Sequence, residues 1–348
     1  MRILIFNWKD RRHPLAGGAE VFTEEVAQAL VVRGHDVTLF VAAVAGRPEQ
    51  ETVEGVSVIR RGSRLGVYKA ARRFWAREGP GAFDVVVDEI NTRPFLTPRW
   101  LRGAPVVALI HQLAREIWFY ETPLPLAVAG RFALEPWWLR AYRDVPALTV
   151  SASSADSLRK HHGWRDVTVV PEGWTPHPLP AVPKEAEPTV VFLGRLVAMK
   201  RPQEAIAAFQ ILRQRLPSAR LWVIGDGPLR LEAQAGVDFL GRLEREELLA
   251  RVAAAHVLVA TSVREGWGLN VSEAAACGTP SIGYAVPGLV DSLGASGGAA
   301  VEPTPTALGN ALTRFFDGSL VLEPRISTVP WQDVAEAVER RLTAAVRG

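Results

Sequence analysis

The feature that most constrains the fold of this chain is a repeated alternation between short apolar runs and helical patterns. The runs are rich in β-branched residues and stay apolar at successive positions, which is typical of parallel strands covered by helices on both faces. Between them lie helical repeats such as 201–216, where Ile206, Phe209 and Leu212 share one face. The alternation predicts doubly wound α/β layers. The expected strands are 2–8, 36–42, 83–90, 105–111, 147–152, 167–173, 189–195, 219–227, 237–242, 256–262 and 279–285.

A proline-rich stretch interrupts this alternation once. Residues 171–188 contain six prolines, which a helix or a central strand would not tolerate, so we expect a linker there. The 348 residues suit two domains of about 150–180 residues each. We therefore expect two Rossmann-like domains facing a cleft, followed by a closing helix. The expected boundaries are 1–170, 171–188 for the linker, 189–328, and 329–348 for the helix, whose apolar stripe is Val334, Val338, Leu342 and Val346.

The composition is that of an ordinary globular enzyme, with 48% hydrophobic and 22% charged residues. No apolar run approaches the roughly 20 residues needed to cross a bilayer. The first residues form a short apolar run followed by a charged cluster, so we expect a first strand rather than a signal peptide, and a cytoplasmic protein. The single cysteine, Cys277, excludes an internal disulfide framework and agrees with that compartment.

The net charge of +3 is unevenly distributed. Residues 1–170 hold 23 Lys and Arg against 18 Asp and Glu, and the segment 59–77 has seven basic residues and no acid. That segment is either a solvated face or a contact with anionic lipid or a charged acceptor. The aromatic segment 117–143 is either ordinary packing or an acceptor wall or membrane-touching surface. The sequence has no nucleic-acid-binding motif, so nucleic acid is not an expected partner.

The stretch 263–280 carries two carboxylates in a glycine-rich connection between a predicted strand and a predicted helix that begins near Asn270. Such a connection lies at the carboxyl edge of a parallel sheet, where ligands bind. Gly268 lets the backbone approach a ligand closely, and the helix N-terminus favours a phosphate. Glu265 in the loop and Glu273 inside the helix therefore face one ligand from different positions.

Two cations follow another predicted strand, which ends at Gly194. Arg195 and Lys200 lie in one strand-to-helix loop and match the charge of a pyrophosphate, which Arg can bind with its planar fork and Lys as a point charge. Two exposed surface cations are the alternative interpretation.

Two features of the N-terminal half fall at the same kind of edge. Gly17 and Gly18 precede the first predicted helix, where backbone amides could hold a phosphate, although a simple turn is the alternative. They do not form the G-x-G-x-x-G fingerprint, so a nicotinamide cofactor is not supported. His111 closes an apolar strand and is either a core-edge histidine or a site residue.

Together these segments resemble the family 4 glycosyltransferases of the GT-B fold. "REGWGLNVSEAAACGTP" is similar to the E-x(7)-E segment of that family, and "FLGRLVAMKRPQEAI" to its Gly-Arg-Leu…Lys segment. "WVIGDGP" resembles the next strand and turn, and "AGGAE" the N-terminal glycine loop. "PWQDVAEAV" resembles the closing helix, which in GT-B proteins crosses back onto the N-terminal domain. The resemblance covers essentially the whole chain and is strongest in 189–292.

The resemblance implies an N-terminal acceptor-binding domain and a C-terminal donor-binding domain. It implies transfer of a sugar from a nucleotide-diphosphate-sugar to a hydroxyl acceptor, such as a glycan, a glycolipid or a small glycoside. Enzymes of this kind usually retain the anomeric configuration and need neither a metal ion nor another cofactor. The expected partners are therefore the nucleotide-sugar donor and the carbohydrate acceptor.

The resemblance also implies roles for individual residues. Glu265 would contact the transferred sugar and help to stabilise positive charge at its anomeric carbon, and His111 would contact the sugar or the β-phosphate. Glu273 would bind the ribose hydroxyls, while Arg195 and Lys200 would hold the diphosphate. The remaining expected donor contacts are Gly17 or Gly18 with the phosphate or sugar, the backbone of Gly268, Leu269 and Asn270 with the sugar and phosphate, and the backbone near Gly241 and Arg242 with the base.

Two departures from the family pattern stand out. Arg201 follows Lys200 where glycine is common in the family, so either cation could reach a phosphate. "PEGW" at 171–174 stands where the family often has Pro-Asn-Gly.

Asp88 and Glu89 are adjacent rather than spaced as the Asp-x-Asp of metal-dependent enzymes, and we interpret them as strand-end residues, with Glu89 or Asn91 as candidate acceptor contacts. Two other functions remain open: a nucleotide-sugar epimerase of the same fold, and a non-catalytic subunit that binds nucleotide sugar.

Overall fold

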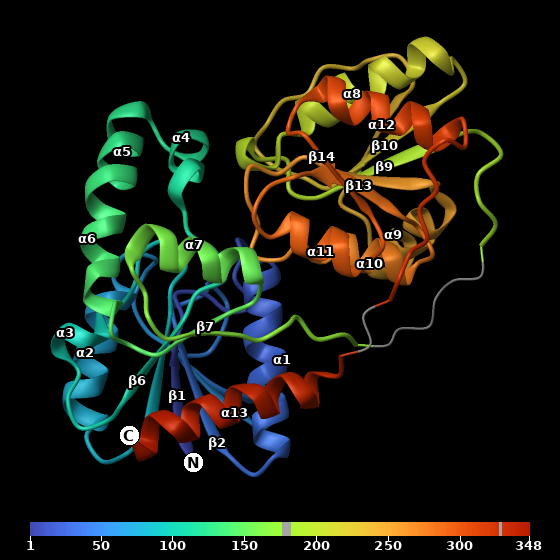
Figure 1. Ribbon diagram of the computed structural model, residues 1–348. Helices are drawn as coiled ribbons and strands as arrows, with labels where there is room; N and C mark the ends of the chain where they lie inside the picture. Colours follow the sequence, from blue (N-terminus) through green and yellow to red (C-terminus); the bar gives the residue numbers. More distant parts are fainter. Residues whose placement is uncertain (176–181, 327–328) are drawn as a thin grey trace. The chain divides into compact units, whose positions relative to one another are not determined.

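The computed structural model describes residues 1–175, 182–326 and 329–348, and these form two α/β units (Figure 1). The division between the units falls inside the predicted linker 171–188, of which residues 176–181 lie outside the described residues. One feature of this division was not expected from the sequence: a short segment in the N-terminal half of the chain belongs to the second unit. Unit 1 comprises Met1–Arg115, Val128–Thr175 and 329–348, and unit 2 comprises Glu116–Ala127 and 182–326.

Unit 1 is built on an eight-stranded sheet with the order β3-β4-β2-β1-β5-β6-β7-β8. All neighbouring strands are parallel except β3 and β4. The order reverses between β1 and β5, so the carboxyl ends of these two strands form the switch point at which open α/β sheets bind ligands. The strands are β1 (Arg2–Phe6), β2 (Asp36–Val41), β3 (Gln50–Val53), β4 (Val56–Arg60), β5 (Val85–Glu89), β6 (Val106–Leu109), β7 (Ala147–Thr149) and β8 (Val167–Val169).

The antiparallel pair β3–β4 was not among the expected strands. Val53 pairs with Val56, so the connection is the two-residue turn Glu54–Gly55, with φ of 47° and 81°. Two positive φ angles are what a type I′ hairpin requires, and glycine adopts the second one without a steric cost. The sequence of β3 is largely polar, which explains why an apolar-run criterion misses it.

Helices cover both faces of the unit 1 sheet. Phe74 and Trp75 of α2 pack into one apolar cluster with Leu4 and Phe40 of the sheet. In the other helical segments of the unit, the aromatic stretch 128–142 forms several short helical turns and not one continuous α-helix. The bounds are α1 (Gly18–Val32), α2 (Val67–Glu78), α3 (Thr97–Trp100), the π-helical turn η2 (Gly130–Leu134), α6 (Glu135–Leu139), η3 (Arg140–Tyr142), α7 (Ala152–His162) and α13 (Trp331–Arg347).

Helix α13 lies alongside α1 in unit 1 (Figure 1). Its Trp331 ring contacts Phe22 with ring centroids 5.8 Å apart, and Trp331 Nε1 donates to Thr175 Oγ1 at 3.0 Å. Gly173 lies directly beneath this ring, since a Cβ there would meet it at 2.4 Å. Of the expected apolar stripe, Val334, Val338 and Leu342 are buried, but Val346 is 43% exposed because it lies in the last turn of the helix, beyond this packing.

Unit 2 is built on a six-stranded sheet in which all neighbouring strands are parallel, with the order β11-β10-β9-β12-β13-β14. The central strand β12 is apolar at every position, and its neighbour β9 is apolar except at Thr189, in agreement with the expected apolar runs. The strands are β9 (Thr189–Leu193), β10 (Arg220–Ile224), β11 (Val237–Gly241), β12 (Val257–Ala260), β13 (Ser281–Tyr284) and β14 (Ala299–Val301).

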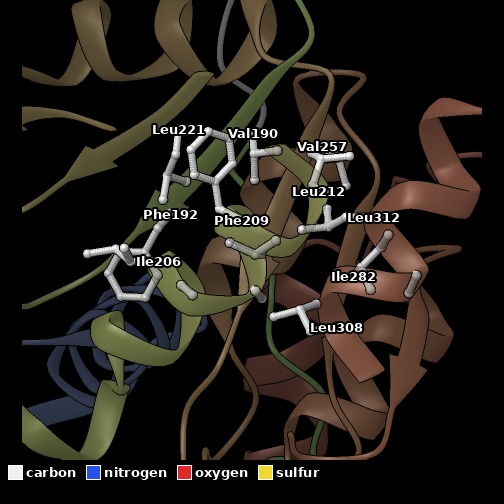
Figure 2. Packing of buried hydrophobic residues seen from close by; sticks show 14 of the residues in the cluster. Val190, Phe192, Ile206, Phe209, Leu212, Leu221, Val257, Ile282, Leu308 and Leu312 are labelled. Carbon is white, nitrogen blue, oxygen red and sulfur yellow. The ribbon is translucent and has the colours of Figure 1, made fainter. Parts of the chain in front are cut away.

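Two helices cover one face of this sheet and three cover the other. Figure 2 shows the first face, where Phe209 of α8 and Leu308 of α12 pack on Phe192 and neighbouring strand residues. On the second face, Val252, Val271 and Leu293 come from three successive helices. The helical elements of unit 2 are η1 (Arg115–Ile117, from Glu116), α4 (Trp118–Glu121), α5 (Leu124–Ala129, to Ala127), η4 (Ala198–Lys200), α8 (Pro202–Arg215), α9 (Arg245–Ala254), α10 (Leu269–Ala276), α11 (Leu289–Ala295) and α12 (Pro305–Phe316). None of the helices in the described residues is both long and apolar enough to cross a membrane.

Candidate active site

The carboxyl edge of the unit 2 sheet carries most of the predicted donor-binding residues. The loops after β9 and β10 approach each other very closely here. Gly225 has a φ of 135°, and a Cβ at this position would lie 2.0 Å from the carbonyl oxygen of Gly194. Only glycine fits such an approach, so the sequence Gly-Asp-Gly after β10 brings the two strand ends together.

Lys200 and Glu265 form an ion pair between the loops after β9 and β12. Ser262 Oγ also donates to Glu265 Oε1, at 2.6 Å, and Glu265 is only 9% exposed. The carboxylate is therefore held by one charged and one neutral donor on the same oxygen. A ligand hydroxyl could therefore donate a hydrogen bond to the other oxygen, Glu265 Oε2.

Arg201, which stands where glycine is common in the family, has a φ of 51°. This left-handed conformation explains why glycine would suit the position. Thr261 Oγ1 is 2.9 Å from the carbonyl oxygen of Lys200 and 3.0 Å from that of Arg201, which fixes the turn. The Arg201 side chain points to Glu204 and Tyr120, whereas Lys200 points to Glu265.

Glu273 on α10 is held by a cation that the sequence analysis did not single out. Arg245 Nη1 donates to Glu273 Oε1 at 2.6 Å. Arg245 and Arg242 both line a cavity of about 390 Å³ at the ends of β9 and β10. The other lining residues are Leu193, Gly194, Ile224, Gly225, Leu243, Glu244 and Leu248.

Helix α10 begins beside this cavity. It starts at Leu269, after Gly268 with a φ of 102°, and Asn270 Nδ2 donates to the carbonyl oxygen of Leu193 at 2.9 Å. That bond ties the first turn of the helix to the end of β9. Arg195 lies exposed in the loop after β9, and Gly241 ends β11 with a φ of 66°.

The remaining predicted site residues lie in unit 1, in the connections that follow β1 and β6, and Glu89 ends the intervening strand β5. His111 Nε2 lies 3.6 Å from Glu89 Oε1, and both side chains are buried. Thr23 Oγ1 donates to Glu89 Oε2 at 2.7 Å, and Asn91 Nδ2 donates to Glu89 Oε1 at 3.3 Å. Glu89 is thus fixed from α1 and from its own strand end, facing the imidazole.

The glycine loop before α1 contributes to the same edge. The backbone N–H of Gly17 donates to Glu20 Oε2 at 2.6 Å, and Lys9 Nζ lies 3.0 Å from the same oxygen. Gly18 is the first residue of α1. The Gly17 amide is therefore occupied by Glu20, so a phosphate at this loop would have to replace that carboxylate.

Burial and neighbouring charges shift the pKa values around His111. Burial opposes protonation of His111, but Glu89, together with Glu172 and Glu20, raises its pKa above the ordinary value. Burial also raises the pKa of Glu20, although Lys9 opposes this. Burial raises the pKa of Glu172 to about 7, and His111 counteracts the shift. The group is a buried histidine among three carboxyl groups.

Asp88, which neighbours Glu89, has a structural role. Its Oδ2 accepts from Thr97 Oγ1 at 2.6 Å and from the Tyr142 hydroxyl at 2.5 Å, deep in the unit 1 core. Sequence reasoning missed Ser262 and Arg245, whose positions became apparent only through their contacts. Glu172 had a weak signal, since it replaces the expected asparagine in Pro-Asn-Gly.

Known protein families match both halves of the chain. The family described as "Glycosyltransferase Family 4" matches residues 16–176, and the family described as "Glycosyl transferases group 1" matches residues 180–325. The glycogen synthase of Mycobacterium tuberculosis is 26% identical over 408 aligned residues, which cover 100% of this chain and 96% of that protein.

Two solved structures share the architecture. Sucrose-phosphate synthase from Thermosynechococcus elongatus matches with a TM-score of 0.71 and 20% identity, over 99% of this chain and 94% of that one. Anabaena HepE in complex with UDP-glucose matches with a TM-score of 0.64 and 15% identity, over 100% and 97% of the two chains. Both family matches, which together span nearly the full sequence, and the two parallel-sheet units lead to one conclusion: the chain belongs to glycosyltransferase family 4 and has the GT-B fold.

Proposed function

We propose that this glycosyltransferase moves a sugar from a nucleotide-diphosphate-sugar to a hydroxyl acceptor with retention of anomeric configuration, and that it does so without a metal ion or another cofactor. The observation that carries the proposal is the Lys200–Glu265 pair, which lies at a sheet edge that also holds Glu273 and a cavity of about 390 Å³. The pair thereby places a candidate phosphate-binding group, Lys200, beside a candidate sugar-binding group, Glu265.

The donor would extend along this edge. The base and ribose would occupy the cavity lined by Arg242 and Arg245, with Glu273 accepting from ribose hydroxyls. The diphosphate would meet Lys200, Arg195 and the N–H groups at the start of α10, all of which favour negative charge. No step in this arrangement calls for a divalent cation, because the two cations offset the charge of the leaving diphosphate.

The chemistry of transfer requires two changes of charge. As the bond to the diphosphate breaks, negative charge grows on the leaving oxygen and positive charge on the anomeric carbon. Lys200 and Arg195 stabilise the first, and the carboxylate of Glu265 stabilises the second, which is the electrostatic preorganisation that accounts for large rate enhancements. His111, whose pKa Glu89 raises against the effect of burial, would in its protonated form supply a further positive charge to the sugar or the β-phosphate.

A thermal-shift screen with UDP-, GDP-, dTDP- and ADP-sugars tests the proposal. A ligand that binds only the folded state raises apparent stability, so the true donor should stand out from the others. With that donor and a hydroxyl acceptor, NMR of the product should show the donor's anomeric configuration, and EDTA should leave the rate unchanged. A product of inverted configuration, or a rate abolished by EDTA and restored by a divalent cation, would overturn the corresponding part. Conversion of donor alone into another nucleotide sugar would instead identify an epimerase.

We also infer a peripheral contact between unit 1 and anionic membrane, which refines the role of segment 59–77. Arg60 in this segment is buried and paired with Asp10 at 2.5 Å, and Arg61 is paired with Glu49 at 2.6 Å, so neither is available to lipid. The exposed cations of the segment are Arg64, Lys69, Arg72, Arg73 and Arg77.

Aromatic side chains lie beside Arg72 and beside Arg99 of the neighbouring helix α3. The Arg72 guanidinium lies 5.8 Å from the Trp100 ring, and that of Arg99 lies 4.0 Å from the Trp137 ring, which links α2, α3 and α6 (Figure 1). Trp137 is 54% exposed and Phe132 66% exposed. Arginines beside exposed aromatic rings suit the interface of an anionic bilayer. Co-sedimentation with liposomes should rise with anionic lipid content, and a flat response would reject this contact.

A further inference from the structure

The segment that begins at Glu116 belongs to unit 2 although the chain on both sides of it belongs to unit 1. The backbone enters this segment at Arg115 with a φ of 35°, a left-handed conformation that costs a non-glycine residue about 1–2 kcal/mol. Strained residues persist where surrounding contacts hold them in place. The contacts that the segment makes therefore bear on its role.

Helix α4 contacts both residues that flank Lys200. The backbone N–H of Met199 donates to Glu121 Oε1 at 3.0 Å. Arg201 Nη2 donates to the Tyr120 hydroxyl at 2.8 Å, and the guanidinium lies 5.3 Å from the centre of the Tyr120 ring. The backbone that carries Lys200 is thus held on each side by a side chain of α4.

Glu116 makes the equivalent contact beside Glu265. Its Oε2 lies 3.3 Å from Nε and from Nη2 of Arg264, the residue that precedes Glu265. The Arg264 side chain is only 6% exposed, and a buried guanidinium depends strongly on its partners. The two loops are also joined directly, because the N–H of Val263 donates to the carbonyl oxygen of Met199 at 2.9 Å.

We propose that Glu116, Tyr120 and Glu121 are positioning residues of the donor site, which hold the backbone that carries Lys200 and Glu265. This inference rests on the proposed function, because it takes the diphosphate of the donor as the ligand of Lys200. When a donor enters, Lys200 and Glu265 must leave each other for the diphosphate and the sugar. With the backbone held, only two side chains reorient, whereas free loops would lose conformational freedom at each binding event.

A comparison of nucleoside monophosphates with diphosphates isolates this effect. Lys200 acts on the diphosphate, so correct positioning of Lys200 increases affinity for a diphosphate over its monophosphate. The probes are the pairs UMP and UDP, GMP and GDP, AMP and ADP, and dTMP and dTDP, titrated calorimetrically into the full chain. The pair used for the variants is the one whose diphosphate binds the unaltered protein most tightly.

Substitutions at Glu121 give the matched comparison. Glu121→Ala removes the acceptor of the Met199 N–H, and we expect diphosphate affinity to fall about tenfold while monophosphate affinity changes by less than about twofold. Glu121→Gln keeps an acceptor oxygen and should restore affinity to within about twofold. Glu187→Gln, which removes an exposed carboxylate 3.8 Å from Arg220 elsewhere in unit 2, is the control and should change neither affinity.

Glu116→Gln adds a test in which the two explanations predict opposite changes in diphosphate affinity. Removing a negative charge near a diphosphate site should tighten diphosphate binding if only electrostatics mattered, whereas a positioning role predicts that binding weakens, by about three- to fivefold. If Glu121→Ala lowers the unfolding midpoint strongly, Tyr120→Phe, which keeps the ring and loses only the hydroxyl, provides the same comparison.

The outcomes are distinct. Selective loss of diphosphate affinity, with rescue by Glu121→Gln, supports the inference. Equal losses for both nucleotides, or diphosphate affinity that is unchanged or higher, overturns it while leaving the proposed function intact. An unaltered protein that binds none of these nucleotides overturns the proposed function and, with it, this inference.

Discussion

Lys200 and Glu265 are 65 residues apart in the sequence, yet each is the charged partner of the other. One lies on the loop after β9 and the other on the loop after β12, two strands that are neighbours in the sheet. The ion pair holds both side chains at the carboxyl edge of the sheet. Under the proposed function, donor binding would exchange one set of charge-assisted contacts for another, instead of desolvating two separate charges.

Glu265→Ala should leave the fold intact and lower turnover by roughly 10²–10³, the scale for the loss of one preorganised electrostatic group. The reason is that positive charge at the anomeric carbon loses its nearest carboxylate. Steady-state kinetics with the donor found by thermal shift checks this, alongside circular dichroism to verify folding. Turnover within a few-fold of the unaltered protein would remove Glu265 from the mechanism.

Glu273→Gln should weaken nucleotide binding by about 10- to 100-fold, because a charged acceptor of ribose hydroxyls contributes about 1.5–3 kcal/mol. Isothermal calorimetry with the corresponding nucleoside diphosphate measures the change. Glu246→Gln, which alters an exposed carboxylate in the first turn of α9, serves as the control for loss of one negative charge. Unchanged affinity in the Glu273 variant would contradict the ribose assignment.

Gly225→Ala should destabilise the protein by more than about 3 kcal/mol, because its Cβ would lie 2.0 Å from a backbone oxygen in addition to an unfavourable φ of 135°. Gly278→Ala is the matched control, since its φ of 72° is also left-handed but the space around it is open. It should cost only about 1–2 kcal/mol. Urea unfolding compares them, and equal costs would show that the close approach of the strand ends is unimportant.

Stability should depend on pH through Glu172. Its folded-state pKa is about 7, above the ordinary value of 4.5, so between these values the folded protein holds a proton that the unfolded chain has lost. Glu172 therefore lowers stability as pH rises toward about 7, and its effect levels off above that pH. Glu172→Gln removes this dependence.

The gain in stability from Glu172→Gln should accordingly be larger at pH 8 than at pH 5, by about 2–3 kcal/mol. Chemical unfolding of both proteins at the two pH values gives the difference, in which the contributions of most other titrating groups cancel. A gain that is the same at both pH values would show that Glu172 does not carry a raised pKa.

The fold was largely predictable because the signals that encode it are local. Continuous apolar runs such as 189–195 identify parallel strands without any knowledge of their neighbours, and the E-x(7)-E spacing places Glu265 and Glu273 relative to one helix. The β3–β4 hairpin was not predicted from the sequence, because β3 is a polar strand at the edge of the sheet and contains no apolar run.

The contacts of the site were less predictable, since they join residues that are distant in sequence. Arg245 binds Glu273 from 28 residues away, and Glu116 reaches Arg264 from 148 residues away. Spacing rules describe one helix or one loop at a time and contain no information about such pairs. A phosphate-binding role for Lys200 stays a prediction from its charge, whereas its partner Glu265 became evident only from the folded arrangement.

The place of α13 has a consequence for how the protein is made. The helix packs along α1, with Arg33 bonded to Glu339 at 2.5 Å and Thr343 Oγ1 lying 3.9 Å from Met1 Sδ. A ribosome delivers α1 before the bulk of unit 2 and α13 after it. Unit 1 is therefore completed only after unit 2 has been synthesised, and α1 must keep an apolar face exposed in the meantime. We therefore expect chaperones to bind stalled nascent chains that lack α13, because the apolar face of α1 is still exposed in them.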